Sequence, residues 1–379
     1  MNKRIEYLIG LALFKLLVGI ILLQVSWSSM SWSDNKILSL VIICSLSFIP
    51  AAFSQKLFNF LNKKEISRFS NTYFLAFIPL IYLIQAPDTP IIFKFLANFL
   101  IWIGIFLIEN IMETIFYILS KDMKQEEKTK LNSQSTMVTH ACTLTGPLTL
   151  PLLNAINITA LPYFLMMIIS LVAFFFVKSD INISKRTTDT QITCFSLKKN
   201  IHAILFIALT WGTLTIINIL IPYIGNQFSS ISVMVSLEIA FVGGMLFAGS
   251  VFTKIANYIN TNLNTMAILL TIVALGLSFS HKSMYLTLPL FFTLGTIFGL
   301  FRMLYRMDLS KSFQPEISSQ IFIMGNAISA PIVALYALLF GMSSTINLGD
   351  FVEFIWILPF SFLIFSLNYC YFKKGLIYG

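Results

Sequence analysis

Long apolar runs alternate with short polar connections along almost the whole chain. Twelve of these runs approach the roughly 20 residues that an α-helix needs to cross a bilayer. They cover approximately residues 7–28, 37–55, 70–86, 91–119, 134–156, 159–177, 201–223, 230–252, 264–280, 284–304, 317–341 and 351–371. The pattern predicts an all-α integral membrane protein with twelve transmembrane helices.

The longest polar connection separates the sixth run from the seventh. Its basic residues are Lys178, Lys185, Arg186, Lys198 and Lys199. Six runs precede this connection and six follow it, so we expect two six-helix bundles around a central cavity. The predicted N-terminal bundle covers residues 1–178, the cytoplasmic linker covers residues 179–200, and the C-terminal bundle covers residues 201–379.

Two internal sequence repeats indicate that the bundles are copies of one module. Residues 56–62 follow the pattern Lys, aliphatic, any, Asn, aromatic, aliphatic, Asn, and residues 254–260 repeat it at an offset of 198 (254 − 56). Both segments follow an apolar run and precede another, so each is predicted to be a short cytoplasmic turn. Pro147 and Pro331 form a second repeat, at an offset of 184 residues (331 − 147). A repeat at about half the chain length indicates duplication.

The basic residues predict the orientation of the chain. If the N-terminus lies in the cytoplasm, 21 of the 25 Lys and Arg residues fall in cytoplasmic segments, as the positive-inside rule requires. Lys36, Lys94 and Lys282 fall outside, and Lys15 falls within the first run. We expect a multi-pass protein of the cell inner membrane with both termini in the cytoplasm. The first run is expected to be a retained helix rather than a cleaved signal peptide.

Composition narrows the class of function. Apolar residues make up 57% of the chain and charged residues only 11%, whereas soluble domains carry about 25% charged residues. Short basic loops explain the net charge of +9, so no nucleic-acid partner is expected. Neither a disulfide framework nor a metal site is indicated by the four cysteines, Cys44, Cys142, Cys194 and Cys370. We find no catalytic constellation and no phosphate-binding glycine loop, so we expect neither an enzyme nor a cofactor.

Twelve runs with a basic turn after the second and the eighth resemble the major facilitator superfamily of secondary transporters. The family's signature in that turn is Gly-x-x-x-Asp-Arg-x-Gly-Arg-Lys. Asn59 stands at the Asp, Asn62 stands at the second Gly, and Lys63 and Lys64 stand at the Arg-Lys pair. Asn257 is the counterpart of Asn59 in the second half. The resemblance implies that these residues form a conformational motif.

Residues 139–153 resemble the antiporter motif of the same family, whose core is Gly-x-x-x-Gly-Pro. Cys142 stands at the first Gly, and Gly146 and Pro147 match the core. The resemblance implies alternating access and places the chain near the proton-coupled exporters of drugs and siderophores. The fourth-helix Arg of many drug antiporters is not found.

Charged side chains inside apolar runs are costly to insert and are therefore candidates for function. Glu109 and Glu113 are four residues apart, which places them on one helix face. Two such carboxylates resist joint ionisation, so one would bind a proton near neutral pH. Glu113 could instead pair with a loop Lys at the interface. Lys15 could pair with Glu109, either as a structural ion pair or as a coupling switch.

Glu238 and His140 are the other proton-coupling candidates. Glu238 is the only charged residue well inside the 230–252 run, and we favour a position facing the cavity over a buried, protonated one. His140 would border the cavity on a stripe with Thr136, Thr143 and Pro147, or would bond to a neighbouring helix. A parallel stripe is typical of a packing seam because its members are small: Ser135, Thr139, Cys142, Gly146 and Thr149.

Other residues have simpler interpretations. Gly243, Gly244 and Gly249 are predicted to allow close helix packing. Arg302 and Arg306 end the 284–304 run, and we interpret them as anchors at the membrane surface. Core or lipid-facing positions are favoured for four large aromatic residues, Trp102, Trp211, Phe291 and Phe292.

The sequence therefore predicts a secondary transporter that exports a small amphipathic compound, such as a drug or a siderophore, by proton antiport. Its expected partners are this small-molecule substrate, protons and the lipid bilayer, and it is expected to act as a monomer. The first alternative is an importer of a nutrient or metal chelate with the same fold. The second is a non-transporting membrane sensor or assembly protein.

Overall fold

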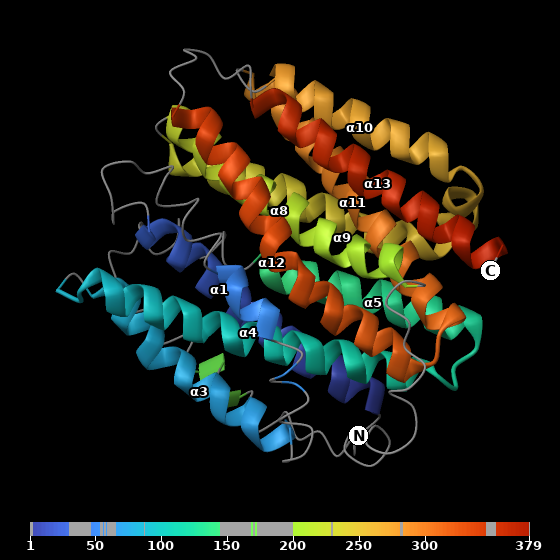
Figure 1. Ribbon diagram of the computed structural model, residues 1–379, viewed down its shortest axis with the longest axis horizontal. Coiled ribbons are helices and arrows are strands. Elements are labelled where there is room, and N and C mark those ends of the chain that lie inside the picture. The colour runs from blue at the N-terminus through green and yellow to red at the C-terminus, as the bar shows by residue number, and fades with distance from the viewer. Residues whose placement is uncertain are drawn as a thin grey trace.

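The computed structural model describes residues 3–29, 47–53, 56, 58, 66–86, 88–144, 168–169, 171–172, 200–228, 230–280, 283–345 and 354–378. These residues are almost all helical, and the helices are shown in Figure 1. They are α1 (Lys3–Ser29), α3 (Ile66–Gln85), α4 (Ile91–Ser120), α5 (Gln125–Thr143), α8 (Ile201–Gln227), α9 (Ile231–Thr261), α10 (Leu263–Ser280), α11 (Met284–Ser312), α12 (Pro315–Thr345) and α13 (Phe354–Tyr378).

Each of these helices corresponds to one of the predicted apolar runs. The run at 159–177 and most of the run at 37–55 lie outside the described residues, so the prediction of twelve spans stays a prediction. The linker at 179–200 also lies outside them, as do Asn59, Asn62, Lys63, Lys64, Gly146 and Pro147. Six described helices, α4 and α8 to α12, contain a span long and apolar enough to cross a membrane.

The predicted turn at 254–260 is wrong. Helix α9 continues to Thr261, so Asn257 lies on an exposed helical surface rather than in a connection. The break comes at Asn262, whose backbone leaves the helical region at φ −111° and ψ 33°. Its side-chain amide donates a hydrogen bond to the Tyr258 carbonyl (2.9 Å), which also accepts the backbone N–H of Asn262 (3.1 Å).

Helix α5 begins at Gln125, earlier than the run predicted from residue 134. Its first turns are polar but become buried where they meet other helices. Asn132 donates to the Met303 carbonyl (2.8 Å), and Ser133 donates to the Gly249 carbonyl (2.6 Å). Hydropathy missed this segment because polar side chains there bond to neighbouring helices instead of to water.

By their order in the chain, we divide the helices into two groups. The first group comprises α1, α3, α4 and α5, and the second comprises α8 to α13 (Figure 1). Within the second group, α9 packs along α11, α8 along α12, and α10 along α13. The two groups meet mainly where α5 contacts α9 and where α4 contacts α12. A site between the groups would therefore be enclosed by helices from both parts of the chain.

Glycines set the spacing of α9 and α11. A Cβ atom added at Gly244 would collide with the Phe292 carbonyl, and one added at Gly295 would collide with the Phe241 carbonyl. On another face of α9, a Cβ at Gly249 would lie 2.6 Å from Met137 of α5. The packing role predicted for Gly244 and Gly249 is confirmed. That of Gly243 is wrong, because a Cβ there meets no atom within 4 Å.

This pair of adjacent glycines gives a matched test of the fold. Gly244→Ala forces the backbones of α9 and α11 apart, and overpacking of this kind costs about 1–3 kcal/mol. Gly243→Ala meets open space and gains about 1 kcal/mol of helix propensity. We expect the midpoint of thermal unfolding in detergent to fall for Gly244→Ala and to stay level or rise for Gly243→Ala. Equal midpoints would contradict the packing described here.

Candidate functional site

A cavity of about 90 Å³ lies between the two helix groups, with room for several water molecules. The first group lines it with residues of α1, α4 and α5, and the second group with residues of α8, α11 and α12. Its charged and ionisable lining residues, the tyrosines aside, are Lys15, Glu109, Glu113, His140, Arg302 and Arg306. Such a concentration of charge is unusual among apolar helices and makes this cavity the candidate site.

Lys15 and Glu109 form an ion pair across the cavity wall. The Lys15 Nζ lies 2.5 Å from the Glu109 Oε2, and the two side chains are only 10% and 14% exposed. This confirms the pairing that the sequence analysis suggested for Lys15 and Glu109. A buried charge without a partner is strongly destabilising, so each of these residues depends on the other.

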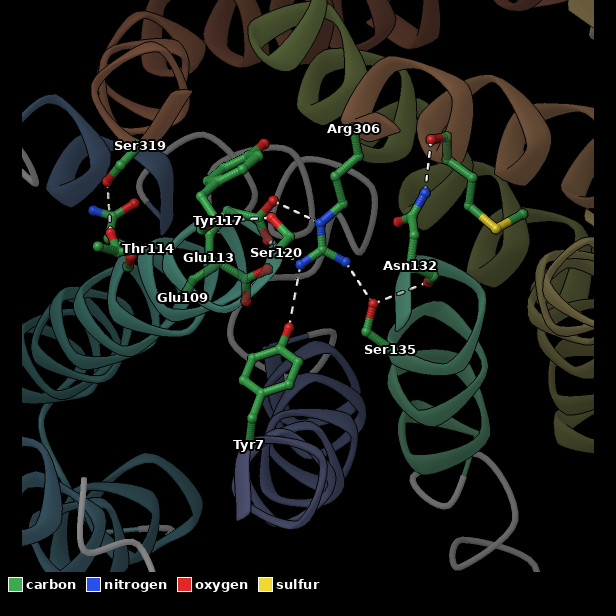
Figure 2. A network of polar contacts seen from close by, with 12 residues as sticks. Tyr7, Glu109, Glu113, Thr114, Tyr117, Ser120, Asn132, Ser135, Arg306 and Ser319 are labelled. Atoms are coloured by element: carbon green, nitrogen blue, oxygen red, sulfur yellow. Dashed lines mark hydrogen bonds and ion pairs between the residues drawn. The ribbon is translucent and has the colours of Figure 1, made fainter. Parts of the chain in front are cut away.

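Arg306 joins four helices at one end of the cavity. Its guanidinium donates to Glu113 of α4 (Nε to Oε1, 2.8 Å; Nη2 to Oε2, 2.7 Å), to the Ser135 hydroxyl of α5 (2.6 Å) and to the Tyr7 hydroxyl of α1 (3.2 Å). It also stacks over the Phe116 ring at 3.5 Å. Figure 2 shows the three bonded side chains converging on Arg306. We call Tyr7, Glu113, Ser135 and Arg306 the Arg306 cluster.

The Arg306 cluster corrects two predictions. Arg306 does not anchor α11 at the membrane surface, and Glu113 does not pair with a loop Lys. Both are largely buried, with side chains 15% and 13% exposed. The physical reason is a matched spacing: Glu109 and Glu113 on α4, and Arg302 and Arg306 on α11, each lie one helical turn apart. That shared spacing was visible in the sequence and could have suggested the pairing.

Arg302 lies one turn from Arg306 and lines the cavity. Within the described part of the chain, it has no side-chain hydrogen bond and no ion pair, although Glu109, Glu113 and Arg306 act on its charge. His140 is 6% exposed and also lacks a side-chain hydrogen bond to any described residue. Arg302 and Lys15 are the charged groups that act on it. Arg302 and His140 therefore line the cavity without a bonded partner among the described residues.

The stripes predicted on α5 are partly wrong. Thr136 and His140 line the cavity as expected, but so does Thr139, which was assigned to the packing seam. Thr143 was expected at the cavity and instead packs against α1, where a Cβ added at Gly19 would meet its backbone. Ser135, a second member of the predicted seam, belongs to the Arg306 cluster. Cys142 is half-buried and forms no disulfide with any described residue.

Glu238 does not line the cavity, so the preferred prediction for it is wrong. No residue of α9 contributes to the cavity, because this helix is used to pack against α11 and α5. Glu238 is half-buried, with no hydrogen bond or ion pair to the rest of the described chain.

A network of amides and hydroxyls crosses between the groups beside the cavity. Asn326 of α12 donates to Asn110 of α4 (2.8 Å) and accepts from Trp211 of α8 (2.8 Å). Thr114 of α4 bonds to Ser319 of α12 (2.6 Å). The sequence analysis missed these contacts, although an Asn in the middle of an apolar run was an available signal.

Comparisons with known proteins address the fold. No family model matches the sequence, and no curated protein matches it. Two crystal structures of a bacterial homologue of the iron transporter ferroportin match over 99% of this chain and 100% of theirs. One, with soaked iron, gives a TM-score of 0.71 at 11% identity, and the other gives 0.70 at 12%. Both are in the outward-facing state.

The nucleoside transporter NupG matches with a TM-score of 0.67 at 15% identity, over 99% of this chain and 100% of its own. The chain thus shares the fold of these membrane transporters. These matches do not select the drug and siderophore exporter branch. Among the described residues, no group of three or more His, Cys, Asp or Glu side chains could hold a metal ion.

The Arg306 cluster is expected to hold the two helix groups together. Arg306→Gln leaves the buried Glu113 without its charge partner, which costs about 3–5 kcal/mol. Spin labels on Cys residues introduced at the exposed Asp122 and Lys311, which belong to different groups, would report the separation after the native cysteines are replaced by Ser. We expect the distance distribution to broaden and shift to longer values in Arg306→Gln.

A second buried pair supplies the control for this experiment. Lys373 lies 2.7 Å from Asp308, and both belong to the second group. Lys373→Gln should lower the unfolding temperature without changing the distance between the labels. An unchanged distribution in Arg306→Gln, or equal broadening in both variants, would show that the cluster does not close the interface.

Proposed function

We propose that the chain is a secondary transporter of the inner membrane, working as a monomer, that moves a small solute by alternating access through this cavity. The buried Lys15–Glu109 pair on the cavity wall carries the proposal, because a membrane protein bears the cost of such charges chiefly where they serve transport. The fold and the walls contributed by both helix groups support it, since rocking of two groups about a shared site is how such folds alternate access.

The Arg306 cluster would act as the gate on one side. In the predicted orientation, Tyr7 lies near the cytoplasmic start of α1 and Glu113 lies near the cytoplasmic end of α4. The cluster then closes the cavity toward the cytoplasm. The outward-facing state of the two ferroportin-homologue structures is consistent with this arrangement.

We further propose that protons drive export. Protonation of Glu109 would remove its charge, release Lys15 and change the balance between the two states of the transporter. One unit of pKa difference between those states supplies about 1.4 kcal/mol of driving force. The direction rests on the resemblance of residues 139–153 to the antiporter motif. A drug or a siderophore would need a wider cavity than this one, because pockets for drug-sized ligands occupy about 300–1,000 Å³.

Small-molecule profiles of cells with and without the protein would test transport and its direction. Intracellular and extracellular fractions would be collected in iron-replete and iron-starved media. We expect at least one compound to accumulate inside the cells that lack the protein. A compound left unused outside those cells would establish import instead. No difference in either fraction would contradict transport and favour a sensor or assembly role.

A double-mutant cycle would test whether the Lys15–Glu109 pair couples transport to protons. Each single variant, Lys15→Met or Glu109→Gln, leaves one buried charge alone and should lower stability by about 3–5 kcal/mol. The double variant should recover most of that loss. We expect proteoliposomes carrying the double variant to lose the dependence of transport on an imposed pH gradient. If a stable double variant retained full transport driven by the pH gradient, the pair would have a structural role and no role in proton coupling.

A further inference from the structure

We infer that the transported solute carries an acidic group, and that Arg302 with His140 forms the site that binds it. The inference rests on the proposed function and names the substrate class of that cavity. A carboxylate, a phosphate or a sulfonate would each be bound by the same hydrogen-bond donors and positive charge. Three features of the described residues lead to it: the charge balance of the cavity, the unbonded donors that share its lining, and the different contacts of two neighbouring arginines.

The first feature is the charge balance of the cavity lining. Its three permanent cations are Lys15, Arg302 and Arg306, and its two carboxylates are Glu109 and Glu113. Lys15 forms an ion pair with Glu109, and Arg306 donates hydrogen bonds to both carboxylate oxygens of Glu113. Arg302 is the remaining cation, so the described lining of the cavity holds one positive charge in excess when His140 is neutral. An anion entering the cavity would balance that charge.

The second feature is the set of donors around Arg302. His140 is more than nine-tenths buried and shares the cavity lining with Arg302, and its ring nitrogens bond to no described residue. The hydroxyls of Thr136 and Thr139 also line the cavity and make no side-chain hydrogen bond within the described chain. A guanidinium presents donors in a fixed fork that suits the oxygens of a carboxylate or phosphate.

The third feature is the contrast between Arg302 and Arg306. They occupy one face of α11, one turn apart, yet Arg306 makes bonds to three helices and stacks on Phe116. Those contacts account for its burial. Arg302 has no comparable contact among the described residues: Glu109 and Glu113 attract its charge, but neither bonds to it. A buried charge without a bonded partner is unfavourable. A structural role therefore accounts for Arg306 and leaves Arg302 unexplained without a ligand.

The other wall of the cavity suits the remainder of such a solute. Phe206 and Trp211 of α8 and Phe322 of α12 line it with aromatic surface. The acidic group would lie toward Arg302, and the apolar part of the solute would lie against these rings. The volume of about 90 Å³ favours a small organic acid in the conformation seen here.

The test sorts transported compounds by charge. Cells lacking the protein would be complemented with wild type, Arg302→Gln, Arg302→Lys or Lys254→Gln, the last being an exposed position on α9 remote from the cavity. Compounds whose distribution depends on the wild-type protein would be passed over an anion exchanger at pH 7. We expect them to be retained there, and we expect their transport to fall by at least about tenfold in Arg302→Gln, the scale of a hydrogen bond to a charged group.

Arg302→Lys should retain part of the transport, because lysine keeps the positive charge but lacks the paired N–H donors of the guanidinium. Lys254→Gln should transport as well as wild type. If Arg302→Gln fails to reach the membrane, purified wild-type protein decides the question. The identified acid should raise its unfolding temperature, and the methyl ester of that acid should not. Each variant's abundance in the membrane would be measured so that transport is compared per molecule of protein.

The outcomes separate this inference from the proposed function. Transported compounds that are neutral or cationic would overturn the acidic substrate while transport itself stands. An acid carried equally by wild type and by Arg302→Gln, or stabilisation by the ester as well as the acid, would overturn the role of Arg302. If no compound's distribution depends on the protein, both the proposed function and this inference are contradicted.

Discussion

A charge buried among apolar helices needs a partner, and in this chain the partners lie on different helices. Lys15 of α1 meets Glu109 of α4, and Arg306 of α11 meets Glu113 of α4. Because an unpaired charge is so unfavourable in this environment, these contacts restrict how the helices can be arranged. Helix α4 supplies both carboxylates and therefore stands at the centre of the charged cavity.

The two ion pairs differ in what they connect. Lys15 and Glu109 both belong to the first helix group, so their pair can open or close without separating the groups. Arg306 links the second group to α1, α4 and α5 at once. Movement of the groups apart must break that cluster, whereas binding within the cavity need only disturb the first pair. The proposed alternating access would use both kinds of contact, one that responds to the solute and one that responds to the conformation.

Close helix packing makes the cavity possible without adding much polar surface. Gly244 and Gly295 bring α9 and α11 into backbone contact, which fixes the position of the helix that carries Arg302 and Arg306. On the other side, the bonds among Trp211, Asn326 and Asn110 tie α8 and α12 to α4. Packing and buried amides thus hold these walls of the cavity in addition to the Arg306 cluster.

The sequence by itself determined the helical membrane architecture and the residues that could carry charge into it, and it suggested the Lys15–Glu109 pair. Hydropathy is a local property, so the architecture and the charged residues could be read run by run, whereas the pair joins two runs and was one possible pairing. Only the tertiary structure decided that Arg306 meets Glu113, that Arg302 has no bonded partner in the described chain, and that Glu238 lies away from the cavity. Those facts depend on which face of one helix meets which face of another, and helices that are apolar all round do not encode their facing side in a pattern of hydropathy.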